Sequence, residues 1–345
     1  MPWSRFFKHS SQTPALWLAC FIGIAMLACG CSFENLTRVT PGSFATPQDC
    51  GECHVDITRE WTSSPHARAY TNPRYRQATD DYHFTQCIPC HAPLPTLTTD
   101  TPQARADSRE LGVSCVSCHL KDGAMVGPQQ PTGMVKPHPI TVDPKAFEGA
   151  QMCGRCHRGT KSQWAASTIP DKHDCRHCHM PEVTRTITKA TSEISRLFVA
   201  MEKAAAEHRH SFDLAPTIAA DQAIILDIVT HPGLANVTLT NRLPHNLPTG
   251  DFGVRIVTVE LSAIDAAGGA LILDSHEFTS AGGAVVPSGE SMHWSVTIPA
   301  NAASLRAVAY RQGRDGADRV SLTQRQVAIT PTAQTQPEKG AATHP

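Results

Sequence analysis

Several features are scarce in this 345-residue sequence. It has no excess of one charge, since 30 Lys and Arg face 31 Asp and Glu and the net charge at pH 7 is -1. Charge therefore gives no support to a nucleic-acid partner. Long apolar runs are rare between Asp49 and Thr186, a stretch rich in Pro, Thr, Gly and Asp. Such a stretch cannot build an ordinary apolar core by itself.

The chain does contain the pattern Cys-x-x-Cys-His, which occurs five times. This is the attachment signal of c-type haem, because the two thiols form thioethers with haem vinyl groups and the adjoining histidine binds the iron. The sequence therefore predicts five c-type haems. The predicted thioether cysteines are Cys50, Cys53, Cys87, Cys90, Cys115, Cys118, Cys153, Cys156, Cys175 and Cys178, and the predicted proximal iron ligands are His54, His91, His119, His157 and His179.

Zinc sites and disulfide redox sites also use two cysteines two residues apart. A zinc site needs its ligands in groups of four and has no need of histidine directly after every second cysteine, yet histidine follows in all five motifs. A thioredoxin-like site occurs once, within a β-α-β pattern that is absent around these motifs. The three cysteines outside the motifs lie at the N-terminus, so no cysteine remains for a structural disulfide.

The N-terminus carries Arg5 and Lys8 followed by an apolar run over residues 15–28. Its charge and length are typical of a secretory signal rather than a membrane span. The sequence Met-Leu-Ala-Cys29-Gly-Cys31 resembles a bacterial lipoprotein processing site, which predicts lipidation of Cys29, with Cys31 or an ordinary signal peptide as alternatives. A lipidated cysteine would tether an exported protein to a membrane without spanning it.

The rest of the chain consists of two regions with different residue patterns. Large porphyrin faces can replace the missing apolar core, so we expect the first domain to be mostly α-helical or irregular and to wrap its haems. The apolar spacing of residues 192–210 predicts a helix. The predicted segments are a lipoprotein-type signal peptide (1–30), a tether (31–46), a pentahaem cytochrome c domain (47–190), a connecting helix (191–214), a β-sandwich domain (215–330) and a disordered tail (331–345).

The second region, residues 215–330, consists of short β-branched and apolar runs separated by turn residues. Seven strands at this spacing favour an all-β, immunoglobulin-like sandwich. The predicted strands are residues 223–230, 236–243, 254–265, 271–280, 292–299, 304–313 and 320–329.

The ligand at the sixth position of each iron separates an electron carrier from a catalyst. Twelve histidines outside the proximal set follow the signal segment, so several are expected to be ligands. Methionines such as Met134, Met152 and Met180 could replace histidine, although one sequence does not favour this. His83 is a reserve candidate.

Short segments of the first domain resemble the multihaem family that includes the tetrahaem electron acceptor of hydroxylamine oxidoreductase. The resemblance covers roughly residues 46–212 and implies that His66, His138 and His173 are distal ligands. The matching segments are Trp61-Thr-Ser-Ser-Pro-His66-Ala, Cys90-His91-Ala-Pro, Gly112-Val-Ser-Cys115-Val-Ser-Cys118-His119 followed by His138-Pro139, and His173-Asp-Cys175 running into Cys178-His179-Met180-Pro181.

Two further distal ligands are predicted from similar motifs. The segment His210-Ser-Phe resembles the end of a helix that follows Cys-x-x-Cys-His-Met-Pro in many small multihaem cytochromes, and implies a role for His210 rather than its neighbour His208. In the β domain, His245-Asn-Leu-Pro-Thr-Gly250 resembles a His-x-x-Pro-Thr-Gly loop of β domains fused to multihaem cytochromes, and implies an axial role for His245. A surface loop is the alternative for His245.

Five filled iron centres favour an electron carrier over an enzyme, because a six-coordinate iron cannot bind substrate without losing a ligand. The expected partners are redox proteins, between a periplasmic donor and a reductase, an outer-membrane conduit or an extracellular acceptor, with membrane attachment through the lipid. The first alternative is an enzyme acting on a small nitrogen compound at one open haem, for which the haem of Cys87 and Cys90 is the candidate because its sixth ligand depends on a distant histidine. No Cys-x-x-Cys-Lys motif is present, which removes the signature of ammonia-forming nitrite reductases.

Two alternatives concern the β domain. In a homo-oligomer or filament, His245 would ligate a haem of the neighbouring molecule. In the other alternative, the domain is a docking module without haem contact.

Overall fold

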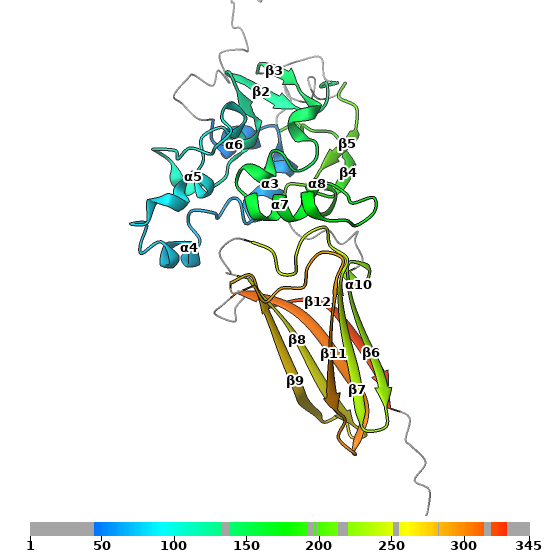
Figure 1. The fold of residues 1–345 in the computed structure, drawn as a ribbon. Helices are drawn as coiled ribbons and strands as arrows, with labels where there is room; N and C mark the ends of the chain where they lie inside the picture. The colour runs from blue at the N-terminus through cyan, green and yellow to red at the C-terminus, as the bar shows by residue number, and fades with distance from the viewer. Residues whose placement is uncertain are drawn as a thin grey trace, which may run out of the picture.

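The structure is a computed structural model that describes residues 45–132, 138–191, 196, 199, 201–212, 220–250, 255–281, 283–313 and 319–329. The predicted signal peptide with Cys29, nearly all of the predicted tether and the predicted tail lie outside these residues. Among the described residues, no helix combines the length and the apolarity needed to cross a bilayer. The chain forms a motif-bearing region of short helices and loops, followed by an elongated β region (Figure 1).

The motif-bearing region (45–212) is built from short helices and very small sheets. Few of its apolar side chains are buried, among them Trp61, Ile88, Val116 and Phe147. This agrees with the expectation that the polypeptide alone does not form an ordinary core here. Its α-helices are α2 (Pro47–Gly51), α3 (Val55–Ser63), α4 (Pro73–Ala78), α5 (Ile88–His91), α6 (Cys115–His119), α7 (Arg158–Ala166) and α8 (Cys175–His179), and its 3-10 helices are η2 (Thr85–Cys87), η3 (Thr96–Thr98), η4 (Arg109–Leu111), η5 (Pro144–Phe147) and η6 (Cys153–Arg155).

Two small sheets complete this region. Strands β1 (Leu120–Lys121), β2 (Ala124–Gly127) and β3 (Ile140–Val142) form one, and β4 (Glu182–Arg185) pairs antiparallel with β5 (Ala205–His208) in the other. The helix expected over residues 192–210 therefore does not continue to its predicted end. The last part forms β5 because its backbone pairs with β4 in register from Arg185 opposite Ala205 to Glu182 opposite His208. Residues 192–195, 197, 198 and 200 of the expected helix lie outside the described part of the chain.

All seven strands expected in the β region are present, after a single helical turn, α10 (Ala220–Ala223). The burial pattern of β7 alternates along the strand, as expected where one face of a strand lies on a core. The strands are β6 (Ile224–His231), β7 (Leu234–Asn241), β8 (Arg255–Asp265), β9 (Ala270–Thr279), β10 (Ser291–Thr297), β11 (Ala302–Gly313) and β12 (Val320–Ala328).

These strands form two antiparallel sheets, one ordered β10-β7-β6 and the other β12-β11-β8-β9. One apolar cluster joins them, since Val237 and Leu239 of the first sheet are buried together with Val259, Leu261 and Leu305 of the second. The β region therefore supplies its own core, unlike the motif-bearing region.

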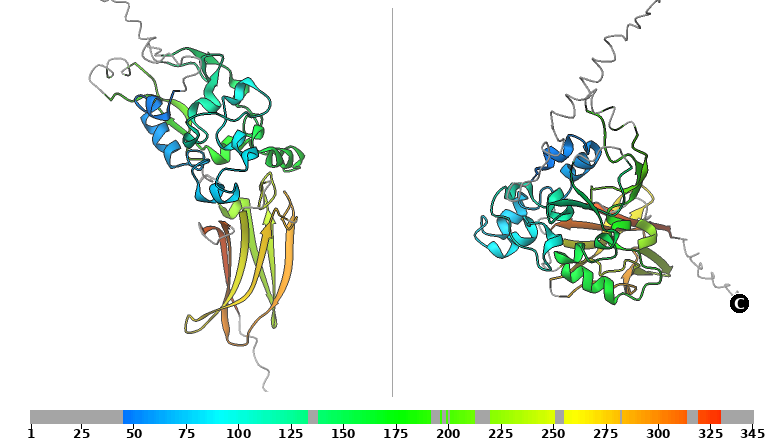
Figure 2. Two further views of the ribbon diagram at one scale, coloured as in Figure 1. Left: turned by 90° about the vertical axis from the view of Figure 1, so that its left-hand side faces the viewer. Right: turned by 90° about the horizontal axis from the view of Figure 1, so that it is seen from above.

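One end of the β region faces helix α7, as the views in Figures 1 and 2 show. The amide oxygen of Gln163 accepts hydrogen bonds from the main-chain N–H of Asn246, at 3.1 Å, and from the hydroxyl of Thr249, at 2.7 Å. The hydroxyls of Thr160 and Thr249 also form a hydrogen bond of 2.8 Å. These contacts join the two regions through neutral groups and place the loop after β7 against the motif-bearing region.

Candidate haem sites

Each Cys-x-x-Cys-His motif lies on a short helical turn. This turn brings the histidine back beside the first cysteine: the main-chain N–H of His54 donates to Cys50 O at 2.8 Å, and that of His157 to Cys153 O at 2.9 Å. Caps stabilise turns that are too short to be stable alone. Thr46 caps α2, Ser114 forms a capping box on α6, and the Asp174 carboxylate caps α8.

Main-chain carbonyls orient the rings of several predicted iron ligands. Nδ1 lies 3.2 Å from Ile187 O in His54, 2.6 Å from Ala69 O in His91 and 2.9 Å from Val126 O in His119. A metal-binding histidine commonly donates its second ring N–H to such an acceptor, which fixes the tautomer and directs the other nitrogen to the metal. The same contact occurs in three predicted distal ligands: His138 at 3.3 Å from Pro139 O, His210 at 2.9 Å from His208 O and His245 at 2.9 Å from Asn246 O.

Three pairs of imidazoles have the spacing that two axial ligands of one iron require. Two rings that bind one metal from opposite sides, each through a metal–nitrogen bond of about 2 Å, have centroids about 6 Å apart. The residues therefore fit bis-histidine haem. The ring centroids lie 6.4 Å apart in His54 and His138, 6.2 Å apart in His66 and His157, and 6.1 Å apart in His119 and His210.

The β region contributes to a fourth pairing. His245 lies near enough to His179 that their charges interact, and together with burial this holds the pKa of His179 at about 4. Burial also lowers the pKa of His245 below its usual value. The predicted loop histidine is therefore within electrostatic reach of a proximal histidine of its own chain.

The surroundings of His91 differ from those of the other four proximal histidines. The ring in contact with it belongs to Tyr75, stacked at a centroid distance of 4.0 Å and an interplanar angle of 18°. Among the described residues, no imidazole makes a ring contact with His91. The reserve candidate His83 is exposed, and its Nδ1 lies 2.5 Å from Asp80 O.

His173 is not placed against any proximal histidine ring of the described residues. Its ring stacks on that of His177, four residues further along the chain, with centroids 3.7 Å apart. Both rings line a cavity of about 430 Å³ together with His208. Ring contacts therefore place three of the five predicted distal ligands beside a proximal histidine, whereas His245 is within electrostatic reach of His179 and His173 lies at this cavity.

Hydrogen bonds through Val113 and Trp61 hold the main chain of His66. The indole N–H of Trp61 donates to Val113 O at 2.8 Å, and the main-chain N–H of Val113 donates to His66 O at 3.0 Å. Burial, with a further contribution from the charge of His157, lowers the pKa of His66 to about 3. Burial and His119 likewise lower the pKa of His210 to about 4. Both rings are thus held neutral, the form in which imidazole binds a metal.

Thiol contacts show which motifs are neighbours. The thiols of three pairs lie close enough to interact: Cys50 with Cys115, Cys90 with Cys156, and Cys153 with Cys175. The first motif therefore touches the third, whereas the second and the fifth both touch the fourth. Cys118 of the third motif also interacts electrostatically with Cys153 and Cys156 of the fourth. The five motifs form one connected group in space.

Two comparisons with known proteins point to multihaem cytochromes. A family model described as cytochrome c554 and c-prime matches residues 49–120. The penta-haem cytochrome c552 from Thermochromatium tepidum has a similar fold, with a TM-score of 0.58 at 17% identity over 83% of this chain and 99% of that chain. The motif-bearing region is thus similar to multihaem c-type cytochromes in its motifs and its fold.

Other matches add little. A superoxide reductase from Nanoarchaeum equitans aligns with 31% of the chain and 94% of its own length at 15% identity, with a TM-score of 0.23 that is too low to bear on the fold. No curated protein matches. Multihaem c-type cytochromes generally transfer electrons and are typically exported.

Some residues that position the predicted iron ligands carry no motif in the sequence. Gln163 holds the loop of His245 from outside. Asn241 holds it from within, since its buried amide donates to the carbonyls of His245 at 2.9 Å, Val286 at 2.9 Å and Pro287 at 3.2 Å. A polar residue at the end of an otherwise alternating strand is the one sequence signal that could have indicated Asn241.

Proposed function

We propose that this cytochrome relays electrons through five covalently attached haems, four of which have two histidine ligands. The observation that carries the proposal is the spacing of three imidazole pairs, 6.1 to 6.4 Å between ring centroids. A haem iron with both axial positions filled exchanges single electrons and has no free position for a substrate. The protein residues supply the ligands, the spacing and the surrounding charge.

The proposed ligand pairs use each proximal histidine once. Both cysteines of each of the five motifs would hold the haems by thioethers. His91 would keep a sixth position that no described histidine fills. The pairs are His54 with His138, His157 with His66, His119 with His210, and His179 with His245.

The thiol contacts support a branched route for the electrons. The first, third and fourth haems would follow one another, and the second and fifth would both branch from the fourth. Haems whose attachment residues touch would be near enough for rapid transfer. The order along this route differs from the order in the sequence, because the second motif lies beside the fourth and the first motif lies beside the third.

The setting of the relay is also part of the proposal. The protein would be exported and held at a membrane through a lipid on Cys29, and it would pass electrons between a periplasmic redox protein and a reductase, an outer-membrane conduit or an extracellular acceptor. We assign residues 47–190 to the haem domain and residues 215–330 to an immunoglobulin-like sandwich. The sheet orders β10-β7-β6 and β12-β11-β8-β9 support this class, because seven antiparallel strands split between two sheets are typical of it.

We infer that His245 acts within its own chain rather than in a filament. His245 is part-buried, with its ring near His179 of the same chain, and its loop is joined to helix α7 through Gln163. A ligand for a neighbouring molecule would have to leave these contacts. The β region would then be a source of an iron ligand rather than a separate docking module.

A second function is favoured by one observation. His91 contacts the ring of Tyr75 and no imidazole ring of the described residues, so the haem of Cys87 and Cys90 would be open to a small ligand. A small nitrogen compound such as nitrite, hydroxylamine or nitric oxide is the class of substrate that fits an open haem in such a protein. Electrons would reach this haem from the fourth motif through the neighbouring Cys156.

Counting spin states in the fully haem-loaded protein tests both functions. We expect four low-spin haems that do not react with carbon monoxide after reduction, and one haem that does. Five unreactive haems would exclude the second function. Several reactive haems would contradict the relay of bis-histidine haems.

A further inference from the structure

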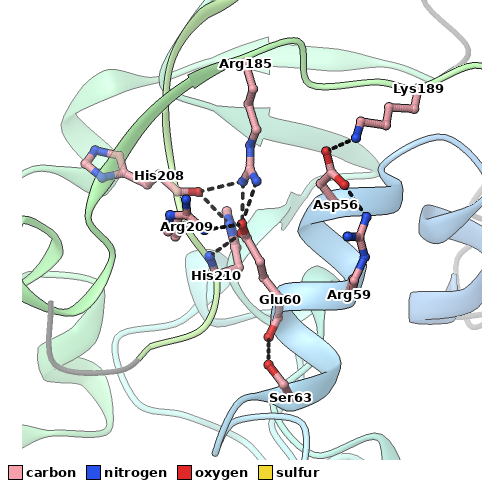
Figure 3. Close-up of polar contacts among 9 residues, drawn as sticks. All are labelled: Asp56, Arg59, Glu60, Ser63, Arg185, Lys189, His208, Arg209 and His210. Carbon is pink, nitrogen blue, oxygen red and sulfur yellow. Dashed lines mark hydrogen bonds and ion pairs between the residues drawn. The ribbon is translucent and has the colours of Figure 1, made fainter. Parts of the chain in front are cut away.

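A buried ion pair lies behind one of the proposed iron ligands. Glu60 of helix α3 and Arg185 of strand β4 form two parallel hydrogen bonds, from Nη1 to Oε1 at 2.7 Å and from Nη2 to Oε2 at 3.0 Å (Figure 3). Their side chains are 16% and 13% exposed. This two-pronged geometry in a largely buried place is the strong form of an ion pair.

The same carboxylate holds the backbone of His210. The main-chain N–H of His210 donates to Glu60 Oε2 at 2.9 Å, and Arg209 Nη1 lies 3.5 Å from Glu60 Oε1 (Figure 3). Burial alone would raise the pKa of the Glu60 carboxyl, but the bonds from Arg185 and His210 and the nearby guanidinium charges hold it below its usual value. Glu60 is therefore a negative charge fixed beside His210.

Arg185 acts on the ring of His210 through a shared carbonyl. Arg185 Nη2 donates to His208 O at 3.2 Å, and Nδ1 of His210 lies 2.9 Å from the same oxygen. A cation that draws on this oxygen makes it a weaker acceptor for the imidazole N–H. Acceptors of this kind set the orientation and basicity of metal-binding histidines.

We propose that Glu60 and Arg185 are positioning residues that set the reduction potential of the haem between His119 and His210. This inference rests on the proposed pairing of these two histidines. The negative charge of Glu60 lowers this reduction potential and the positive charge of Arg185 raises it. With both residues present, the potential lies between the values expected with either charge alone. Helix α3 thus carries Glu60, which holds the proposed ligand of one haem. His66, the proposed ligand of another haem, follows three residues after the end of this helix.

The expected signs follow from charge. Oxidised iron carries one more positive charge than reduced iron, so a nearby negative charge favours oxidation and a nearby positive charge favours reduction. In Glu60→Gln the unpaired Arg185 raises the potential, and it also draws harder on His208 O, which makes the His210 ring less basic. In Arg185→Gln the unpaired Glu60 lowers the potential, and His208 O becomes a better acceptor for the ring.

The test is a redox titration of the full haem-loaded protein, followed haem by haem through its low-spin signals. We expect one and the same haem to shift to higher potential in Glu60→Gln and to lower potential in Arg185→Gln, each by a severalfold change in its ratio of reduced to oxidised form. The control is Glu260→Gln, which removes a similar carboxylate, one that pairs with Arg319 at 3.4 Å in the β region. It should shift no haem.

Shifts of equal sign, or no shift in either variant, would overturn the inference, because a loosened strand would affect both variants alike. If these buried variants do not load haem, Arg209→Gln decides, since Arg209 is 51% exposed and its loss should lower the same potential slightly. No shift in that variant would then overturn the inference. His210→Gly tests the pairing of His119 with His210 separately. It should convert one low-spin haem to a high-spin haem. If it converts none, the proposed pairing fails, whatever the other variants show.

Discussion

The main chain of Gly112 packs closely against the carbonyl oxygen of His66. A Cβ atom on this glycine would be 2.4 Å from that oxygen and 2.9 Å from Ala67 O. Its φ of +58° is also in the left-handed region that favours glycine. The close approach allows Val113 to bond His66 O, and so connects the third haem motif to a proposed ligand of the fourth haem.

We therefore expect Gly112→Ala to displace His66. The left-handed backbone alone costs about 1–2 kcal/mol for a residue with a Cβ, and the clash with two carbonyl oxygens adds to it because backbone atoms cannot turn away. One low-spin haem should become partly high-spin and reactive toward carbon monoxide. Absorbance spectroscopy of the reduced protein before and after the gas is added measures this.

Gly123→Ala is the matched control for that variant. Gly123 has a similar positive φ of +79°, but no atom lies within 4 Å of its would-be Cβ. It should therefore show the backbone cost without any change in spin state. Equal effects of the two substitutions would mean that strain in the backbone, rather than contact with His66, is responsible.

The two histidines His245 and His173 should respond differently to removal. The resemblance to known motifs predicts both as iron ligands, but the structure places His245 near His179 and stacks His173 on His177. His245→Gly should add one carbon monoxide-reactive haem, and added imidazole should restore the low-spin spectrum by filling the gap. His173→Gly should add none. The reverse result would show that His173, and not His245, is the ligand.

Much of the site is readable from the sequence because haem attachment is a local, covalent signal. Each cysteine pair and its histidine fit within one helical turn, so the five motifs need no knowledge of the fold. The pairing of histidines is a different problem, since His54 meets His138 and His119 meets His210 only through the path of the whole chain. Glu60 and Arg185 are 125 residues apart and belong to no motif, so no sequence pattern predicts their contact.

The fold shows the same division. Short β-branched and apolar runs between turn residues predict all seven strands of the β region, and these strands share a common core. The end of the predicted helix over residues 192–210 is strand β5 instead. Its apolar spacing is compatible with a helix, but the backbone hydrogen bonds of β4 decide its form. Long-range pairing of this kind leaves little trace in a short sequence window.

Asp174 should matter for stability in a way that depends on pH. Its carboxylate caps α8 at His177 N, at 3.1 Å, and pairs with Arg176 at 2.8 Å. Burial raises the pKa of this carboxyl, but the bonds from Arg176 and His177 outweigh it and the pKa lies below its usual value. The unfolded chain thus binds its proton at a higher pH than the folded protein, so the stabilisation is complete above the usual pKa of about 4 and is lost as the pH falls further.

Asp174→Ala should accordingly lower the free energy of unfolding by about 1 kcal/mol at pH 7. The difference from the unchanged protein should shrink as the pH falls below about 4. Asp174→Asn is the comparison variant, because asparagine can still cap the helix but has no charge for Arg176. Denaturant unfolding followed by the low-spin spectrum measures all three proteins, and a difference that grows toward acid pH would contradict the assignment.

The link between the two regions should depend on the hydroxyl of Thr249. This hydroxyl bonds both Gln163 and Thr160, and valine has nearly the same shape without it. Each of these two neutral hydrogen bonds contributes about 0.5–1.5 kcal/mol, so losing both in Thr249→Val should weaken docking of the His245 loop by roughly fivefold to a hundredfold. We expect faster binding of carbon monoxide to one reduced haem, because His245 leaves its iron more often, while the β region unfolds at an unchanged temperature. Thr238→Val, which removes an exposed hydroxyl on β7 that bonds His293 at 2.9 Å, is the control and should leave the rate unchanged. An unchanged rate in Thr249→Val would show that the His245 loop stays in place without these bonds.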